Sequence, residues 1–264
     1  MAYLELQNLS KRFSKRAGLF TSRLEIVDAV KDVSLTIEQG EILGLVGESG
    51  CGKSTLSRLV MQLLHPTSGS VILEGERLAD LTPESIRARR RDFQMIFQDP
   101  YASLNPRMTV FSTLAESILT RHPDKSASEI EQSVGELMER VGLDVRYVRK
   151  YPHEFSGGQR QRIAIARALG TEPKLVIADE PVSALDVSIQ SQILNLLLRL
   201  RDELNLTMIF ISHDLAVVRY LSDRIVVMDE GQVVEIGEAN AVFENPQSET
   251  AKALLAAVPQ IQVA

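Results

Sequence analysis

The chain has 264 residues, of which 44% are hydrophobic and 24% are charged, and its formal net charge is −6. This length allows one large or two small domains, and no stretch approaches the roughly 18 apolar residues that a membrane span requires. The negative charge argues against general affinity for nucleic acid or for an anionic lipid surface. A single cysteine, and a start without the basic and apolar regions of a secretory signal, predict that the chain works in a reducing cytoplasm.

The sequence also lacks the patterns that are typical of a protein metal cluster. One cysteine excludes an internal disulfide, a cysteine metal cluster and a zinc finger. The histidines have neither i, i+4 spacing nor adjacent cysteines; they are His65, His122, His153 and His213. Two basic runs, at residues 11–16 and 87–91, are interpreted as solvated faces or element ends.

Strand patterns flank a glycine-rich loop in the first third of the chain. Tyr3 to Leu9, Ala29 to Ile37 and Val71 to Leu73 alternate apolar and polar residues, which predicts a small antiparallel sheet. Ile42 to Val46 is a short apolar run that suits a buried parallel strand. Thr55 to Leu64 has apolar residues at helical spacing.

An octapeptide that fits the pattern G-x-x-x-x-G-K-S joins that strand to that helix. It comprises Gly47, Glu48, Ser49, Gly50, Cys51, Gly52, Lys53 and Ser54. The glycines allow backbone N–H groups to turn inward around phosphates, and the helix that continues through Thr55 adds its positive N-terminal end. Lys53 is placed to neutralise the outer phosphates, and the Ser54 hydroxyl is placed to hold Mg²⁺. The octapeptide therefore predicts a nucleoside triphosphate ligand, and the alternative is a flexible glycine turn.

Helical periodicity replaces the strand pattern from Arg107 to about Tyr151. Residues 126–129, Ser-Ala-Ser-Glu, predict a helix start. A buried stripe is expected to follow at Ile130, Val134, Leu137, Met138 and Val141. Three apolar strands separated by helix-length segments then predict a parallel sheet, at Lys174 to Asp179, Thr207 to Ser212 and Arg224 to Asp229. A small helix and tail are expected from Ala251 to Val263.

Two further motifs indicate phosphate chemistry. Asp179 and Glu180 end an apolar strand, where open parallel sheets bind ligands. Asp179 would hold the magnesium shell, and Glu180 would orient the attacking water. The alternative is a pair of exposed acids at a strand end.

The second motif precedes a helical run at residues 160–169, and it comprises Ser156, Gly157, Gly158 and Gln159. It offers an anion a second helix N-terminus. The alternative is a serine cap with permissive glycines, which explains the serine but not the glycine pair.

Together these motifs resemble those of the ATP-binding subunits of ABC transporters, and the resemblance covers nearly the whole chain. It implies an α/β P-loop fold with a parallel-sheet core, an N-terminal antiparallel β subdomain and an inserted helical subdomain. It also implies that the segment Ser156–Gln159 closes over ATP held by an opposite subunit. The family's Q-loop matches Gln98, its D-loop matches Ser183–Asp186, and its switch histidine matches His213.

The resemblance gives each of these residues an expected role. Gln98 would supply an oxygen to Mg²⁺ or to the attacking water and let the nucleotide move the helical insertion. His213 would hydrogen-bond the terminal phosphate or Glu180, the alternative being a structural histidine at a strand end. Asp186 would lie at the dimer boundary rather than act as a plain helix cap. Phe13 would stack on adenine, the alternative being a core or surface phenylalanine.

Three segments resemble one branch of the family, the importer subunits for dipeptides, oligopeptides and nickel. They are residues 98–107, 154–163 and 180–190, and the long spacer between Phe13 and Val30 is also typical of that branch. Two features differ from it. Many members carry His-Pro-Tyr-Thr after an Asn-Pro near the C-terminus, where this chain has Gln-Ser-Glu-Thr at 247–250. Some members hold an iron-sulfur cluster with terminal cysteines, whereas the sole cysteine here is Cys51.

We therefore expect a single ABC ATPase domain over residues 1–264. Its catalytic core with the β subdomain would comprise 1–98 and 171–240, its helical signature subdomain 99–170, and its tail 241–264. We expect hydrolysis of ATP with Mg²⁺ by a homodimer or heterodimer at the cytoplasmic face of the inner membrane. Permease subunits would dock near residues 98–119, a solute-binding protein would act indirectly, and the solute would be a peptide, nickel or a related small molecule. Two alternatives remain: an accessory ATPase of a soluble complex such as carbon-phosphorus lyase, and a slow nucleotide-gated regulatory clamp.

Overall fold

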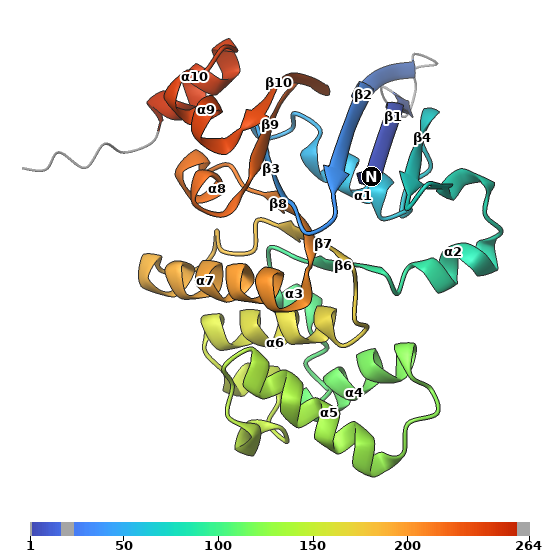
Figure 1. Cartoon of the computed structure of the whole chain (residues 1–264), viewed down its shortest axis with the longest axis vertical. Helices are drawn as coiled ribbons and strands as arrows, with labels where there is room; N and C mark the ends of the chain where they lie inside the picture. Colours follow the sequence, from blue (N-terminus) through green and yellow to red (C-terminus); the bar gives the residue numbers. More distant parts are fainter. Residues whose placement is uncertain (1, 17–23, 258–264) are drawn as a thin grey trace, which may run out of the picture. The chain divides into compact units, whose positions relative to one another are not determined.

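The computed structural model describes residues 2–16 and 24–257, and the chain divides into two compact units (Figure 1). Unit 1 comprises Met1–Ile86 and Ile209–Ala264, and unit 2 comprises Arg87–Met208. The chain passes between the units within helix α2 (Pro83–Arg89) and within strand β8 (Thr207–Ile211). Within residues 2–16 and 24–257, none of the helices combines the length and the hydropathy of a membrane span. The expected spacer and tail include residues 17–23 and 258–264, which lie outside the described residues.

Unit 1 contains the antiparallel sheet that the N-terminal alternation predicts. Its strands are β1 (Ala2–Arg16), β2 (Leu24–Glu38), β4 (Ser68–Leu73) and β5 (Glu76–Arg77), in the order β2-β1-β4-β5, and the short 3-10 turn η1 (Leu78–Asp80) follows. The pairings of β1 with β2 and β4, and of β4 with β5, are antiparallel. Leu4, Leu6 and Leu9 of β1 are at most 2% exposed, so one face of the sheet packs into the core. The expected sheet is confirmed, and β1 and β2 extend beyond the predicted segments.

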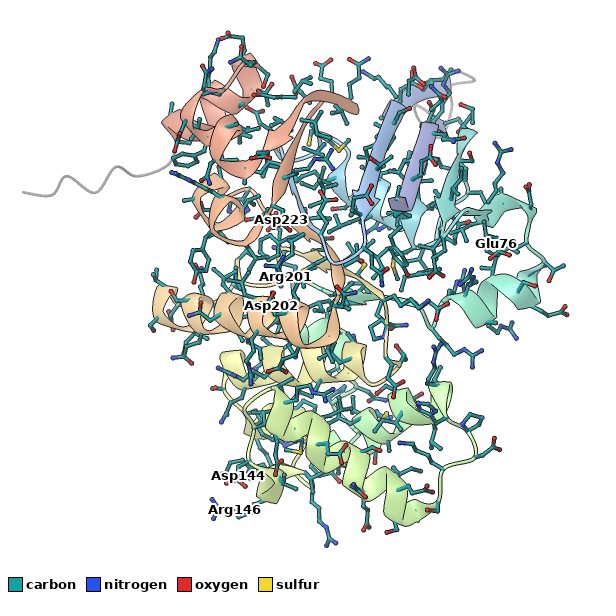
Figure 2. All side chains as sticks on the ribbon, viewed as in Figure 1. Glu76, Asp144, Arg146, Arg201, Asp202 and Asp223 are labelled. Carbon is teal, nitrogen blue, oxygen red and sulfur yellow. The ribbon has the colours of Figure 1, made fainter. Side chains whose placement is uncertain are left out.

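A second group of strands in unit 1 carries the glycine-rich loop. These strands are β10 (Gln232–Glu238), β9 (Arg224–Asp229), β3 (Ile42–Val46) and β8, in that order. Strand β3 is buried along its whole length and runs parallel to β9, whereas β10 is antiparallel to β9. Asp223, labelled in Figure 2, fixes the start of β3, because its Oδ2 accepts from Ile42 N at 2.8 Å and its N donates to Ile42 O at 2.9 Å. The helices of this unit are α1 (Lys53–Val60), α8 (Leu215–Leu221), α9 (Ala239–Glu244) and α10 (Glu249–Ala256).

Unit 2 combines two parallel strands with a helical segment. Strand β6 (Phe93–Ile96) pairs in parallel with β7 (Leu175–Asp179), with Ile96 opposite Ala178. The helices are α3 (Pro100–Ser103), α4 (Val110–Arg121), α5 (Ala127–Arg140), α6 (Gly157–Leu169) and α7 (Val187–Leu204). Two 3-10 turns, η2 (Val145–Tyr147) and η3 (Pro152–Glu154), lie between α5 and α6. Figure 1 shows α4 and α5 packed beside α6, which agrees with the predicted switch to helical structure.

Most predicted helix boundaries hold within a few residues. Helix α5 begins where its capping signal predicts, since Ser126 and Glu129 form a reciprocal capping box. The predicted stripe of this helix is buried except for Ile130, which is partly exposed. Helix α1 ends at Val60 rather than at the predicted Leu64, because Gln62 adopts a left-handed φ of 53°.

Candidate functional site

The octapeptide forms the turn between β3 and α1, and the backbone there requires glycine. Gly47 and Gly52 have φ values of 152° and 111°. A Cβ at Gly47 would lie 2.3 Å from Met228 O, and a Cβ at Gly52 would lie 2.3 Å from Ala29 O. Gly52 is also the N-cap residue of α1, so the first N–H groups of that helix adjoin the loop.

Lys53 carries the positive charge of this loop and is only 7% exposed. Its Nζ donates to Gly47 O at 2.7 Å and to Glu48 O at 2.8 Å. The Sγ atom of Cys51 lies 3.6 Å from the same Nζ. The ammonium group is therefore held inside the loop, while the neighbouring Ser54 side chain is exposed. The loop thus places one cation and one exposed hydroxyl beside the N-terminus of α1, which is a suitable setting for a phosphate chain.

The remaining positions of the octapeptide form its outer edge. Glu48, Ser49 and Gly50 are exposed, and Thr55 in the first turn of α1 is half-buried. The backbone of Cys51 is fixed because its carbonyl oxygen accepts from Gly231 N at 2.9 Å. The loop is therefore anchored on its inner side and open on its outer side.

Phe13, the expected adenine-stacking residue, is a partly exposed side chain of β1. The residue is 39% exposed, and the Nζ of Lys11 lies 5.2 Å from the ring centroid. It stands opposite Val27 of β2, which is 50% exposed. Phe13 is thus not a core residue, and its ring is accessible for stacking.

His213 lies in the short connection between β8 and α8, also in unit 1. Its side chain is exposed. The next residue, Asp214, caps α8 by accepting from Ala216 N at 2.9 Å. On the other side, Ser212 N donates to Leu45 O of β3 at 3.3 Å. The imidazole is therefore held between two anchored backbone positions at the end of a buried strand.

Unit 2 brings Gln98 and Glu180 together. The parallel pairing of β6 and β7 places the residues that follow both strands at the same edge, and Asp179 is the last residue of β7. Gln98 Nε2 donates to Glu180 Oε2 at 3.1 Å and lies 3.3 Å from Ser183 Oγ. Ser183 Oγ in turn donates to Glu180 O at 3.1 Å. A neutral amide and a hydroxyl thus orient the carboxylate and its backbone.

The segment Ser156–Gln159 starts α6 with a reciprocal cap. Ser156 Oγ accepts from Gln159 N at 3.4 Å, and Gln159 Oε1 accepts from Ser156 N at 3.0 Å. Ser156 therefore caps α6, as that interpretation predicts, but the cap does not explain the two glycines. Gly157 and Gly158 are the first two helical residues, and neither has a positive φ.

Asp186 precedes α7, but its carboxylate does not cap that helix. The first-turn amides of Ile189 and Gln190 donate instead to the backbone oxygen of Asp186, at 2.9 and 2.8 Å. The plain-cap alternative for Asp186 therefore lacks the side-chain hydrogen bond that would define it.

Two arginines of α6, which the sequence motifs did not single out, join this helix to the segment after Gln98. The guanidinium of Arg160 lies 3.7 Å from the ring centroid of Tyr101, and Arg167 Nη1 donates to Ser103 O. Burial lowers the pKa of both arginines from its usual value, because desolvation disfavours the charged form. The available sequence signal was the seven-residue spacing of Arg160 and Arg167, which places both on one face of a helix that also carries Arg162.

The expected metal ligands are oxygen donors. They are the Ser54 hydroxyl in unit 1 and, in unit 2, the Gln98 amide and the Asp179 carboxylate. Among the described residues, no group of three or more His, Cys, Asp or Glu side chains could hold a metal ion. An all-oxygen set with a single carboxylate suits Mg²⁺, which keeps waters and takes further ligands from substrate phosphates.

Comparisons with known proteins agree with this set of motifs. The ABC transporter family profile matches residues 30–183. The oligopeptide transport ATP-binding proteins AppF of Bacillus subtilis and OppF of Escherichia coli K12 are each 50% identical to this chain. The matches cover 97% of this chain and 78% and 77% of those proteins. The glutathione import ATP-binding protein GsiA of Pectobacterium atrosepticum is 51% identical over 97% of this chain, which spans 41% of that longer protein.

Solved structures extend the similarity to the fold. CbiO1 from Clostridium perfringens, part of the ABC transporter complex cbiONQ, superimposes with a TM-score of 0.80 at 29% identity, over 92% of this chain and 91% of its own. The ATP-binding cassette MJ0796, in a dimeric post-hydrolysis state bound to ADP and Pi, gives a TM-score of 0.77 at 32% identity, over 89% of this chain and 98% of its own. The chain therefore belongs to the ABC transporter family, in which it is an ATP-binding protein that hydrolyses ATP.

Proposed function

We propose that this chain is the ATP-hydrolysing subunit that energises an importer for oligopeptides, glutathione or a related small solute. The observation that carries this proposal is the 50% identity, over 97% of the chain, with two oligopeptide transport ATP-binding proteins. The relatives named above are described by peptide and glutathione transport rather than by nickel, so peptide-like solutes come first. In this role the chain would act at the cytoplasmic face of the inner membrane, held there by integral permease subunits.

The proposed reaction is in-line attack of water on the terminal phosphate of ATP. Lys53 and the N–H groups of the glycine loop would neutralise the phosphate oxygens, where negative charge develops in the transition state. Glu180 would orient the water and accept its proton. The hydrogen bond from Gln98 Nε2 to Glu180 Oε2 supports this role, because it fixes the carboxylate before water is engaged. His213 would sense the terminal phosphate by hydrogen bonding.

Mg²⁺ would be held by Ser54, Gln98 and Asp179 together with the phosphates of ATP. The Gln98 amide supports this assignment, because its nitrogen is committed to Glu180 and Ser183 and its oxygen end is the part that suits a cation. When bound, the ion supplies positive charge that offsets the charge developing on the phosphate oxygens.

Dimerisation would complete each site. Ser156–Gln159 of one subunit would close over ATP held by the glycine loop of the other, with Asp186 at the boundary. The similarity to a cassette solved as a dimer bound to ADP and Pi supports this arrangement. The carboxylate of Asp186 supports this arrangement as well, because the residue is exposed and its side chain makes no capping hydrogen bond to α7.

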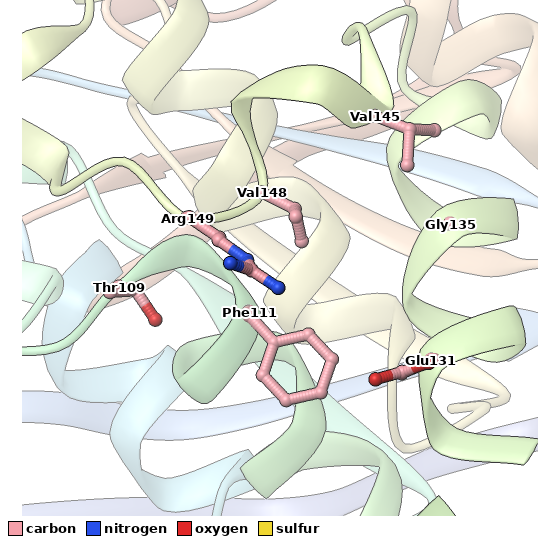
Figure 3. Close-up of a pocket in the computed structure, with 7 residues that line it drawn as sticks. All are labelled: Thr109, Phe111, Glu131, Gly135, Val145, Val148 and Arg149. Atoms are coloured by element: carbon pink, nitrogen blue, oxygen red, sulfur yellow. The ribbon is translucent and has the colours of Figure 1, made fainter. Parts of the chain in front are cut away.

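The proposed permease contact covers residues 98–119 of unit 2. A cavity of about 390 Å³ adjoins this stretch at Thr109 and Phe111, and Figure 3 shows the Phe111 ring between Glu131 and Arg149. The lining combines an aromatic surface with one acid and one base. Such a lining suits an apolar side chain of a permease segment flanked by polar groups.

Charge reversal in this stretch tests the proposed coupling. Arg107→Glu should lower ATP-dependent uptake of a labelled oligopeptide while basal ATP hydrolysis stays unchanged, because Arg107 is exposed and lies outside the nucleotide motifs. Arg77→Glu is the matched control, since it reverses an exposed arginine of unit 1. Normal uptake by the Arg107 variant would move the docking surface elsewhere.

Copurification from membranes tests the transporter itself. The tagged chain should be recovered from solubilised membranes with integral permease subunits, and uptake of an oligopeptide or glutathione should depend on ATP. Recovery only with soluble enzymes would replace this proposal with the accessory ATPase. Uptake of Ni²⁺ without uptake of peptides would change the solute class.

A further inference from the structure

The two glycines of the segment Ser156–Gln159 occupy different surroundings. A Cβ built on Gly158 would lie 2.5 Å from Ile189 Cγ2, a separation that real Cβ atoms essentially never show. A Cβ built on Gly157 would lie 3.4 Å from Leu185 Cδ2, which is an ordinary van der Waals contact. Only Gly158 therefore requires the absence of a side chain in this packing.

Backbone conformation does not account for Gly158. It lies in the first turn of α6, and its φ is not positive. In a helix, glycine is less favourable than alanine because it loses more backbone freedom on folding. The close approach of Ile189 explains why residue 158 is glycine, because α6 can lie against α7 at this distance only where no Cβ intervenes.

Ile189 in turn is tied to the D-loop segment Ser183–Asp186. Its N donates to Asp186 O at 2.9 Å, and Gln190 Nε2 donates to Leu185 O at 2.9 Å. The Cγ2 methyl sits on a β-branched carbon whose χ1 rotamer is strongly restricted in a helix. Ile189 therefore cannot give way to a Cβ by rotating an outer bond, and the contact is stiff.

We propose that Gly158 is a packing position that locks the start of α6 onto Ile189, which makes Ser156–Gln159 and Ser183–Asp186 move as one body. Ile189 is then a positioning residue, because it acts on the nucleotide only through the segment Ser156–Gln159. The inference rests on the proposed dimeric site, in which both segments face the partner subunit. Closure of the segment Ser156–Gln159 over one nucleotide would thereby shift the D-loop segment towards the second site.

Three variants test this lock: Gly158→Ala, Ile189→Ala and the two combined. Gly158→Ala should push the start of α6 away from α7, and a misplacement of about an ångström is expected to lower kcat about 100-fold. ATP binding by the glycine loop, measured by nucleotide titration of the monomer, should be unchanged because that loop lies in unit 1. Ile189→Ala removes the Cγ2 methyl, so the double variant should recover the kcat of Ile189→Ala alone. In a Glu180→Gln background, ATP-dependent dimer formation should show the same loss and the same recovery.

Each outcome bears on the inference. A double variant that stays as inactive as Gly158→Ala would mean that the nucleotide, not Ile189, excludes a side chain, and would overturn the proposal. So would full activity of Gly158→Ala. If the unsubstituted protein forms no ATP-dependent dimer, the proposed dimeric site fails separately. Denaturation midpoints of the same variants then test the packing itself. The double variant must have a higher midpoint than Gly158→Ala alone, and a midpoint that is not higher refutes the lock.

Discussion

Replacing Glu180 by glutamine separates the charge of this side chain from its shape. The carboxylate accepts from Gln98 Nε2 at 3.1 Å, and an amide oxygen can accept in the same position. Ser183 Oγ donates to the backbone oxygen of Glu180, which the substitution does not alter. Losing the charge assistance of one hydrogen bond changes stability by about 1 kcal/mol at most. The fold should therefore be kept.

The backbone conformation at Glu180 also predicts that replacement by glutamine changes the stability little. Its φ of 47° lies in the left-handed region, which is unfavourable by roughly 1–2 kcal/mol for a residue with a Cβ. Glutamine meets the same strain, so this contribution cancels in the comparison. Removal of a general base, by contrast, is expected to slow hydrolysis by about 100-fold to 10,000-fold, or about 3–5 kcal/mol in the transition state. The catalytic effect should exceed the effect on stability several times over.

Steady-state phosphate release, nucleotide titration and size-exclusion chromatography with ATP measure the three consequences. Glu180→Gln should hydrolyse ATP slowly, bind it normally and accumulate a closed dimer. Glu172→Gln is the matched control, because Glu172 lies in the same unit and also has a left-handed φ, of 51°. Its Oε1 lies 3.0 Å from His122 Nε2, so its carboxylate has a different partner from that of Glu180. Undiminished hydrolysis by Glu180→Gln would refute its assigned role, and a large loss of stability would show that the Gln98 contact is chiefly structural.

Three further predictions concern the surroundings of Cys51, Arg160 and Glu235. Cys51 is 5% exposed, and its Sγ lies 3.6 Å from Lys53 Nζ. Alkylation of Cys51 should therefore block ATP hydrolysis, and bound ATP should protect the thiol. Normal hydrolysis by fully modified protein would show that the thiol has no role in the site. Tyr101→Leu and Arg160→Gln should show a coupling of about 1 kcal/mol in a urea double-mutant cycle, because the stacked guanidinium is buried, and additive effects would contradict this. Burial raises the pKa of Glu235, but three hydrogen bonds from the segment before α10 outweigh it and hold that pKa below its usual value. Thermal denaturation should therefore show that Glu235→Ala destabilises at neutral pH, and that the difference from the unsubstituted protein fades as pH falls through the folded-state pKa; a difference independent of pH would count against this.

The parts of the site that the sequence predicts are those built from neighbouring residues. The apolar run before Gly47 and the helical spacing after Ser54 fix a strand, a loop and a helix, because local propensity and burial agree there. The start of α5 is equally local, since Ser126 and Glu129 cap one helix turn. Strand β6 escaped prediction because its four residues are too few to show a period.

Contacts between distant residues were beyond the sequence patterns. Arg160 and Tyr101 belong to different helices, and no local period connects them. The packing of Gly158 on Ile189 is of the same kind, since only the folded backbone brings α6 and α7 together. The altered C-terminal segment is a third case: its Ser248 Oγ donates to Glu235 of β10 at 2.7 Å, a pairing set by the fold of unit 1.

The capping and phosphate-binding interpretations of Ser156 are compatible in this structure. As a cap, Ser156 Oγ uses one lone pair to accept from Gln159 N. A serine hydroxyl retains one O–H donor when it accepts, and that donor can be directed at an anion. The reciprocal bond from Ser156 N to Gln159 Oε1 fixes the backbone around the hydroxyl, and Ser156 itself is exposed. The cap therefore preorganises the hydroxyl, so in the proposed dimer the feature that stabilises α6 would also prepare Ser156 to bind the partner's nucleotide.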